Sequence, residues 1–255
     1  GSVLFNGRDL VKLREQELQD IRGREIAMIF QDVGAALDPI EKIKRQYAEA
    51  IAVHEKQPKQ TYFERAVGML QKMHLTDPKR VMDAYPFELS GGMKQRVGIA
   101  MGMTAQPRLL LADEPTSALD VTIQAQILNL LMDLQDEKKL TYVFITHDLS
   151  VVKHISHEIM VMYLGQCVEY AKTEDLFKNP LHPYTKGLLD AVPIPSLKAK
   201  KLSTEVMRGE LTSPVDPAPG CRFAARCPYA TDACRGRDIP LKEVEPGHFV
   251  SCTHF

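Results

Sequence analysis

The sequence has no long apolar run and no excess of charge of one sign. No apolar stretch reaches the roughly 18 residues that a membrane-spanning helix needs. The 32 basic and 33 acidic residues nearly cancel, so no overall field attracts nucleic acid or an anionic bilayer. Residues 1–20 lack the basic and then apolar layout of a secretory signal. We therefore expect a globular cytosolic protein that binds no nucleic acid and whose ligands are held by local sites.

Strand and helix patterns alternate along the first part of the chain. Apolar runs predict strands at 2–5, 25–30, 108–112 and 142–146, and Asn6-Gly7 predicts a hairpin turn after the first strand. Between the last two strands, apolar residues recur at helical spacing: Ile123, Ile127, Leu130, Leu131 and Leu134. A strand, a helix and a strand in this order predict an α/β core with a parallel sheet.

The remaining segments predict an insertion and an extension. Residues 41–105 are rich in charge and lack a strand pattern, which indicates a helical insertion. Strands at 159–164 and 167–170 and helices within 173–191 precede a Pro-rich linker at 193–219. The tail from Gly220 holds four of the five cysteines. Because the chain begins inside a sheet, we also expect its N-terminal end to be truncated.

Polar residues follow the two apolar strands of the core. Asp113 and Glu114 end the run LLLADEP, and His147 and Asp148 end the run YVFITHD. In a parallel sheet, ligands gather beyond the carboxyl ends of the strands, and adjacent carboxylates there suit a Mg²⁺-nucleotide site. The alternatives are that Asp-Glu-Pro only starts a turn and that His147 is a satisfied polar residue at a strand end.

A second anion site is indicated by Ser90, Gly91 and Gly92, which stand directly before a helical pattern. Glycines let the backbone approach a ligand closely, and a helix start presents free N–H groups to an anion such as phosphate. The alternative is a serine N-cap followed by a glycine pair.

The order of these motifs resembles the ATP-binding cassette (ABC) ATPases. Gln31 after a strand, LSGGMKQR at 89–96, LLLADEP at 109–115, SALD at 117–120 and FITHD at 144–148 are similar to the Q-loop, signature, Walker B, D-loop and switch histidine of that family. The resemblance implies a P-loop NTPase-like (RecA-like) ABC core with a parallel sheet, a helical subdomain and a small cysteine-containing C-terminal extension. It divides the chain into residues 1–40, 41–105, 106–192 and 193–255.

The resemblance also implies a role for each motif residue, with ATP and Mg²⁺ as cofactors. Asp113 would hold Mg²⁺, Glu114 would position or deprotonate the attacking water, and His147 would contact the γ-phosphate. Gln31 would ligate the metal and link it to a transmembrane partner.

Other motif residues would act on an ATP bound to a second ATPase subunit. The signature residues would bind that ATP, and Asp120 would reach across the dimer interface. The signature residues concerned are Ser90, Gly91, Gly92 and Gln95.

The segment EDLFKNPLHPYTKGLL at 174–189 resembles one that follows the core in oligopeptide, dipeptide and nickel importer ATPases. Taken by itself, it predicts a proline-punctuated turn into a helix. The resemblance implies a peripheral ATPase on the cytoplasmic side of the inner membrane. Its partners would be permease subunits, a second ATPase and a periplasmic or extracellular substrate-binding protein. Peptide is the favoured cargo, with nickel as the alternative.

One family motif does not occur. The 255 residues contain no G-x-x-x-x-G-K-[ST], the Walker A loop whose backbone and lysine cradle the β- and γ-phosphates. We therefore expect a chain that cannot bind its own ATP in the usual way and is inactive alone. The alternative is a non-catalytic interaction module that binds the permease or a partner ATPase.

Four cysteines of the tail follow the spacing C-x5-C-x6-C-x17-C: Cys221, Cys227, Cys234 and Cys252. Common zinc modules use C-x2-C pairs, and disulfides are disfavoured in the cytosol. Four thiolates within 32 residues predict a [4Fe–4S] cluster, and the resemblance extends to the cysteine-containing tail of dipeptide-type ATPases. Zinc and free thiols are the alternatives. Cys167, on a predicted strand, is expected to be a small buried hydrophobe.

Overall fold

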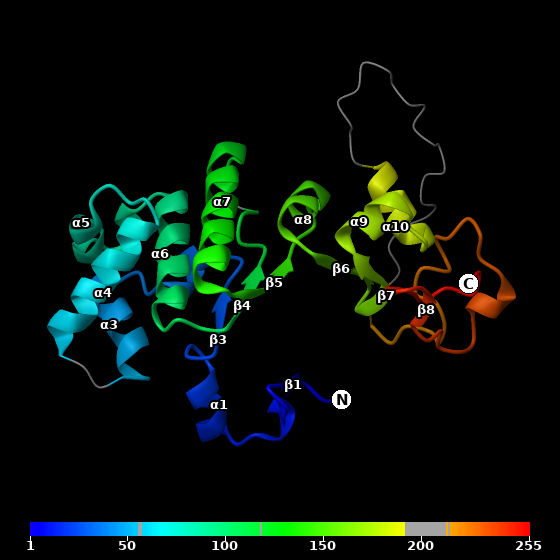
Figure 1. Ribbon diagram of the computed structural model, residues 1–255, viewed down its shortest axis with the longest axis horizontal. Coiled ribbons are helices and arrows are strands. Elements are labelled where there is room, and N and C mark those ends of the chain that lie inside the picture. Colours follow the sequence, from blue (N-terminus) through cyan, green and yellow to red (C-terminus); the bar gives the residue numbers. More distant parts are fainter. Residues whose placement is uncertain (56–57, 118, 192–212, 214) are drawn as a thin grey trace, which may run out of the picture. The chain divides into compact units, whose positions relative to one another are not determined.

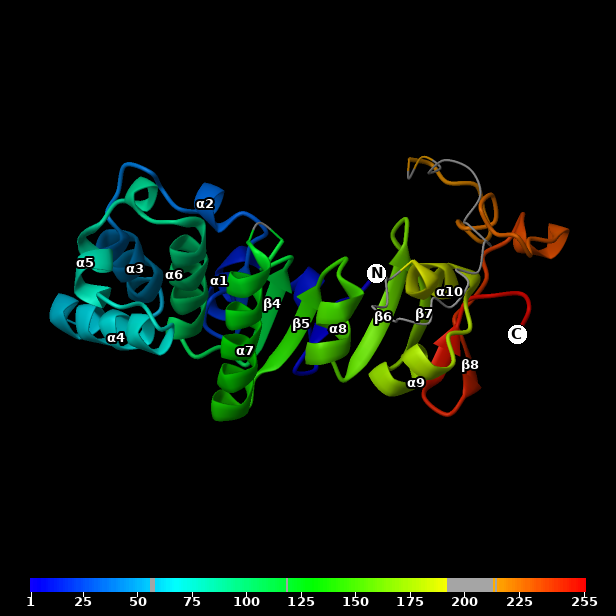
Figure 2. The same cartoon turned by 90° about the horizontal axis from the view of Figure 1, so that it is seen from above.

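The computed structural model describes residues 1–55, 58–117, 119–191, 213 and 215–255, and it divides the chain into two compact units. One unit is Gly1–His147 and the other is Asp148–Phe255 (Figures 1 and 2). Among the described helices, none has both the length and the apolar character needed to cross a bilayer. The division into residues 1–40, 41–105, 106–192 and 193–255 stays a prediction.

The first unit combines a small hairpin, a parallel sheet and a group of helices. Its elements are β1 (Leu4–Phe5), β2 (Arg8–Asp9), a 3-10 turn (Leu10–Lys12), α1 (Glu15–Ile21), β3 (Ile26–Ile29), α2 (Val33–Ala36), α3 (Ile43–Ala52), α4 (Lys59–Lys72), α5 (Pro78–Asp83), a 3-10 turn (Pro86–Glu88), α6 (Gly91–Thr104), β4 (Leu109–Asp113), α7 (Val121–Lys138) and β5 (Thr141–Ile145). The predicted hairpin is confirmed, since Asn6 and Gly7 have φ values of 49° and 77° between two antiparallel strands.

The sheet of the first unit has the order β3-β4-β5 and is parallel throughout, as the sequence predicts. Leu110 and Ala112 of the central strand β4 are buried. Helix α7 connects β4 to β5, and Tyr142 of β5 donates a hydrogen bond of 2.7 Å from its hydroxyl to the Leu131 carbonyl of α7. Because the strands run parallel, their carboxyl ends meet at one edge of the sheet.

Helices α3, α4, α5 and α6 occupy the segment between β3 and β4 and gather at one side of the sheet (Figures 1 and 2). In the described part of residues 41–105 there is no strand. Tyr47 of α3 is fully buried, and its hydroxyl lies 2.5 Å from Thr104 Oγ1 at the end of α6. A Cβ added to Gly98 would lie only 2.5 Å from Val33 Cγ1, so glycine lets α6 approach α2 closely.

The second unit is built on an antiparallel sheet with the order β6-β7-β9-β8. Its elements are α8 (Leu149–Ile155), β6 (Glu158–Tyr163), β7 (Gln166–Lys172), α9 (Thr173–Lys178), α10 (Pro183–Asp190), a 3-10 turn (Asp232–Cys234), β8 (Lys242–Glu245) and β9 (His248–Val250). The predicted strands at 159–164 and 167–170 are confirmed as β6 and β7. Most of the predicted linker at 193–219 lies outside the described residues.

A buried carboxylate anchors the turn between α9 and α10. Glu169 of β7 accepts hydrogen bonds from the backbone N–H groups of Leu181 and His182, and it pairs with His248 of β9 at 2.8 Å. Burial lowers the pKa of His182 to about 4, so the ring is neutral at neutral pH, and its Nδ1 accepts a hydrogen bond from the Tyr184 N–H. Pro183 begins α10, which confirms the proline-punctuated turn.

Candidate functional site

The carboxylate of Glu114 joins the ends of the three parallel strands. Glu114 follows β4, Gln31 lies just beyond β3, and His147 lies just beyond β5. Gln31 Nε2 donates a hydrogen bond of 3.0 Å to Glu114 Oε2, and His147 Nδ1 lies 3.0 Å from Glu114 Oε1. The structure therefore brings together the three residues that the sequence assigns to catalysis.

The electrostatics of this contact favour an ionised Glu114. The hydrogen bond from His147 is the main reason that the pKa of Glu114 is lowered, with weaker contributions from Ser117 and Gln31, while partial burial acts in the opposite direction. An ionised carboxylate can only accept hydrogen bonds, so His147 Nδ1 carries the shared hydrogen. A water molecule approaching Glu114 would meet a proton acceptor.

Asp113 is the last residue of β4 and directly precedes Glu114. Its side chain is half-buried. Over the described residues, no group of three or more histidine, cysteine or acidic side chains is placed to hold a metal ion. Magnesium in nucleotide sites usually takes one or two carboxylates together with phosphate oxygens and water, so the single carboxylate of Asp113 at the end of β4 fits a metal that arrives with its nucleotide.

Ser90 caps the amino end of α6, and its hydroxyl accepts a hydrogen bond of 3.3 Å from the Met93 N–H. A Cβ on Gly92 would lie 3.0 Å from Ile123 Cγ2, whereas a Cβ on Gly91 would meet open space. Gly92 therefore allows α6 to pack beside the first turn of α7. Gly91 is exposed and leaves its backbone accessible to a ligand.

Asp120 and Gln95, the other two residues predicted to bind the partner's ATP, lie at the start of α7 and on α6. Asp120 caps α7 by accepting hydrogen bonds from the N–H groups of Thr122 and Ile123. Gln95 lies on α6 and is buried, with its Nε2 unpaired among the described residues. In this conformation Gln95 faces the protein interior and Asp120 serves its own helix.

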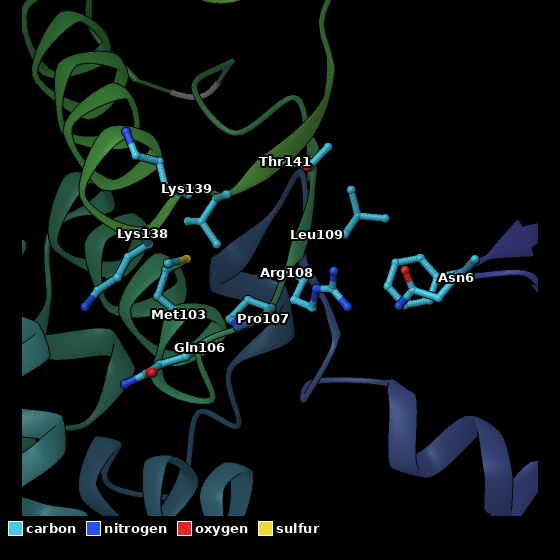
Figure 3. Close-up of a pocket in the computed structure, with 11 residues that line it drawn as sticks. Asn6, Met103, Gln106, Pro107, Arg108, Leu109, Lys138, Lys139 and Thr141 are labelled. Carbon is cyan, nitrogen blue, oxygen red and sulfur yellow. The ribbon is translucent and has the colours of Figure 1, made fainter.

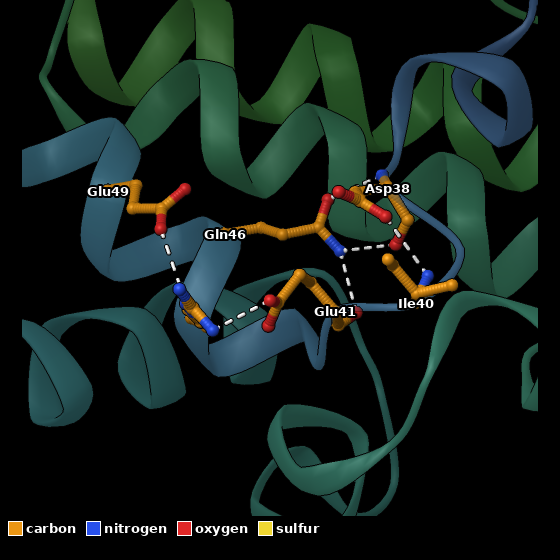
Figure 4. A network of polar contacts seen from close by, with 6 residues as sticks. Asp38, Ile40, Glu41, Gln46 and Glu49 are labelled. Atoms are coloured by element: carbon orange, nitrogen blue, oxygen red, sulfur yellow. Dashed lines mark hydrogen bonds and ion pairs between the residues drawn. The ribbon is translucent and has the colours of Figure 1, made fainter.

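The segment that connects Gln31 to α3 is held by Gln46 (Figure 4). The Gln46 side-chain amide donates to the carbonyls of Asp38 and Glu41, and its oxygen accepts from the Asp38 N–H. Arg45 pairs with Glu41 on one side and Glu49 on the other. This network holds the stretch from Asp38 to Glu41, which follows the short helix α2, against α3.

A cavity of about 530 Å³ lies at the opposite edge of the parallel sheet (Figure 3). Leu109 and Thr141, the first residues of β4 and β5, line it together with the basic residues Arg108, Lys138 and Lys139. Because Glu114 and His147 follow the last residues of these strands, this cavity is separate from the candidate site.

The predicted [4Fe–4S] cluster finds no support in the geometry. No described group of cysteines is placed to hold a metal ion, and Cys221, Cys227, Cys234 and Cys252 are free thiols. Burial raises the pKa values of Cys221, Cys227 and Cys252, which opposes the thiolate form that a metal requires. Cys167 is only half-buried, so the expectation of a buried hydrophobe is wrong there.

Sequence reasoning assigned no separate role to Ser117, although it begins the SALD motif. Its backbone N–H and its hydroxyl both donate to the Glu114 carbonyl, at 3.2 and 3.1 Å. The SALD motif was the feature of the sequence that could have pointed to Ser117. The contact itself depends on the backbone conformation of Glu114, which the sequence does not reveal.

The parallel sheet, the helical insertion and the linked Gln31, Glu114 and His147 define an ABC ATPase. The family model described as "ABC transporter" matches residues 1–117. The dimeric ATP-binding cassette MJ0796, solved in a post-hydrolysis state bound to ADP and Pi, superposes with a TM-score of 0.61 at 29% identity, over 68% of this chain and 73% of its own.

The more particular family is shown by two further comparisons. The model "Oligopeptide/dipeptide transporter, C-terminal region" matches residues 168–234. A probable peptide ABC transporter ATP-binding protein of Sinorhizobium fredii is 44% identical, over 99% of this chain and 75% of its own length. The dipeptide transport ATP-binding protein DppD of Escherichia coli is 44% identical, over 97% and 75%. The chain belongs to the ATP-binding subunits of the oligopeptide and dipeptide ABC transporters.

Proposed function

We propose that Glu114, His147 and Gln31 form the hydrolytic group of this ABC importer subunit, which couples ATP hydrolysis to peptide transport. The observation that carries the proposal is the pair of contacts, each 3.0 Å, that join Glu114 to Gln31 and to His147. Glu114 accepts a proton from the attacking water or orients that water toward the terminal phosphate. His147 holds Glu114 in place and lies where a γ-phosphate would approach.

Asp113 and Gln31 would hold Mg²⁺ together with the nucleotide, and a bound Mg²⁺ would supply positive charge against the phosphates. Gln31 also begins the segment that leads through α2 to the residues held by Gln46, so a movement of that segment would displace Gln31 from Glu114.

The signature helix meets an ATP on a second ATPase subunit. Ser90, Gly91 and Gly92 present the amino end of α6, which carries partial positive charge and free N–H groups. Gln95 and Asp120 belong to the same proposed surface. The dimeric state of the MJ0796 cassette with ADP and Pi supports this arrangement by similarity.

The assembly consists of this chain, a second ATPase subunit, membrane permease subunits and a substrate-binding protein. We place the chain on the cytoplasmic side of the membrane as a peripheral subunit. Relatives named for peptide and dipeptide transport favour peptide cargo over nickel.

We further propose that a [4Fe–4S] cluster is a cofactor of the tail. This proposal is supported by the spacing of the four cysteines in the sequence alone. Ligation needs the thiols to lose their protons and to move into a common ligand set. No other part of the proposed function depends on the cluster.

The test is Glu114→Gln in an importer assembled with a form of this subunit that carries a Walker A loop, because Glu114 acts on a nucleotide held by that loop, and with the partner subunit's own hydrolytic site inactivated. We expect turnover to fall by about a hundredfold or more, because the general base is lost while the size of the side chain is kept. Glu64→Gln, at an exposed glutamate of α4, is the matched control and should leave turnover unchanged. Unchanged turnover and transport with Glu114→Gln would instead support the non-catalytic interaction module.

A further inference from the structure

The backbone of Glu114 is held in a conformation that a glutamate rarely adopts. Its φ is 43°, in the left-handed region where a side chain normally costs about 1–2 kcal/mol. Such a conformation persists only when its surroundings impose it. The Glu114 N–H donates to the Ile145 carbonyl at 2.9 Å, which ties the residue to the end of β5.

Ser117 supplies the second constraint. Its N–H and its Oγ both donate to the Glu114 carbonyl, at 3.2 and 3.1 Å, so one residue closes the turn with two hydrogen bonds. The Ser117 side chain is exposed, so it contributes little to the core. The contact that its hydroxyl makes is the hydrogen bond to the Glu114 carbonyl.

The direction of the Glu114 side chain follows from this backbone. Because the left-handed φ sets the Cα–Cβ direction, the carboxylate points to Gln31 on one side and His147 on the other. With a relaxed, negative φ the Cβ would point elsewhere, and both contacts would lengthen.

We infer that Ser117 is a positioning residue for Glu114, and that its hydroxyl holds the left-handed turn that aims the carboxylate into the hydrolytic site. This inference rests on the proposed function of Glu114. Ser117 acts through Glu114 and touches no reacting atom.

The first experiment needs no nucleotide. Crystal structures of the purified chain are compared for the wild type, Ser117→Ala and Ser117→Thr. We expect φ of Glu114 to leave the left-handed region with Ser117→Ala, and the 3.0 Å distances from its carboxylate to Gln31 and His147 to lengthen. Ser117→Thr keeps the hydroxyl and should keep both distances. Unchanged backbone and distances with Ser117→Ala would overturn the inference.

The second experiment measures turnover in the same importer as the Glu114→Gln test, in which this subunit carries a Walker A loop. Ser117→Ala should lower kcat about tenfold with KM for ATP unchanged, because a misaimed base weakens the chemical step and not binding. Ser117→Thr should restore kcat, which a loss of general packing would not allow. Unchanged kcat with Ser117→Ala, while Glu114→Gln still abolishes turnover, would overturn the Ser117 inference alone. Retained turnover with Glu114→Gln would overturn the proposed function and this inference together.

Discussion

Gln31 and Glu114 are 83 residues apart in the sequence, and a hydrogen bond of 3.0 Å joins their side chains. The contact exists because β3 and β4 run parallel in register, from Ile26 beside Leu109 to Ile29 beside Ala112. Gln31 also begins the segment that leads to α3. That segment includes α2. We therefore expect a change in the helical region that moves this segment to shift Gln31 relative to the Glu114 carboxylate.

The first prediction concerns the charge of Glu114. Replacing His147 with Ala removes the main cause of the lowered pKa, so we expect the Glu114 pKa to rise toward its ordinary value. Because the folded-state pKa is lowered, the contact stabilises the protein above the unfolded-state pKa and is lost as the pH falls through the folded-state pKa. The variant should lose this acid-side dependence of stability.

The pKa of the Glu114 carboxyl can be measured by ¹³C NMR, and the pH dependence of unfolding by calorimetry. His154→Ala, at an exposed histidine of α8, is the control and should change neither quantity. A Glu114 pKa that stays low in His147→Ala would contradict the prediction.

The second prediction compares two helical glycines. Gly98→Ala should destabilise the protein by about 1–3 kcal/mol, because the new methyl would lie 2.5 Å from Val33 Cγ1 and push α6 away from α2. Gly68→Ala in α4 meets no atom within 4 Å and should stabilise by about 0.5–1 kcal/mol through helix propensity. Urea unfolding measures both changes, and equal effects of the same sign would contradict the packing argument.

The sequence predicts β3, β4, β5, β6 and β7 because their apolar runs are strong and bounded. It does not predict α2 or α8, which have four and seven residues and are too short to show a helical period. It also misses β8, whose four residues are all exposed and show no alternation.

The candidate site is predictable by residue type and less so by contact. The motif order singles out Gln31, Glu114 and His147, whereas their hydrogen bonds depend on strand register. The left-handed φ of Glu114 and the double donation from Ser117 arise from tertiary constraints, which no local pattern in the sequence records.

The third prediction tests the amino end of α6 in a mixed dimer whose partner subunit has an intact phosphate-binding loop. Ser90→Arg should lower hydrolysis at the partner's site by about tenfold or more, because the bulky side chain blocks the approach of phosphate to the helix end. It also removes an N-cap, which costs about 1 kcal/mol of stability.

Asp77→Arg is the matched control for that loss, because Asp77 caps α5 by accepting a hydrogen bond from the Arg80 N–H. We expect a comparable fall in stability with no fall in hydrolysis. Full activity of the Ser90→Arg dimer would show that Ser90 serves only as a helix cap.

The fourth prediction concerns the tail. If the four cysteines ligate a [4Fe–4S] cluster, anaerobically purified protein should be brown and carry about four irons per chain. Cys227→Ser should bleach the colour, while Cys167→Ser on β7 should leave it unchanged. The arginines near these cysteines in the sequence, Arg222, Arg226 and Arg235, would offset the negative charge of such a cluster.

In the structure, hydrogen bonds of Cys234 would have to change before a cluster could form. Cys234 shares hydrogen bonds with the hydroxyls of Thr231 and Thr253, at 3.7 and 3.2 Å, and these contacts must break or rearrange before its sulfur can bind iron. Loss of the cluster should therefore weaken the folding of the tail, and leave the contacts of Glu114 with Gln31 and His147 intact. Four titratable thiols without iron or zinc in the folded anaerobic protein would contradict the cluster, and stoichiometric zinc would replace it with a structural zinc site.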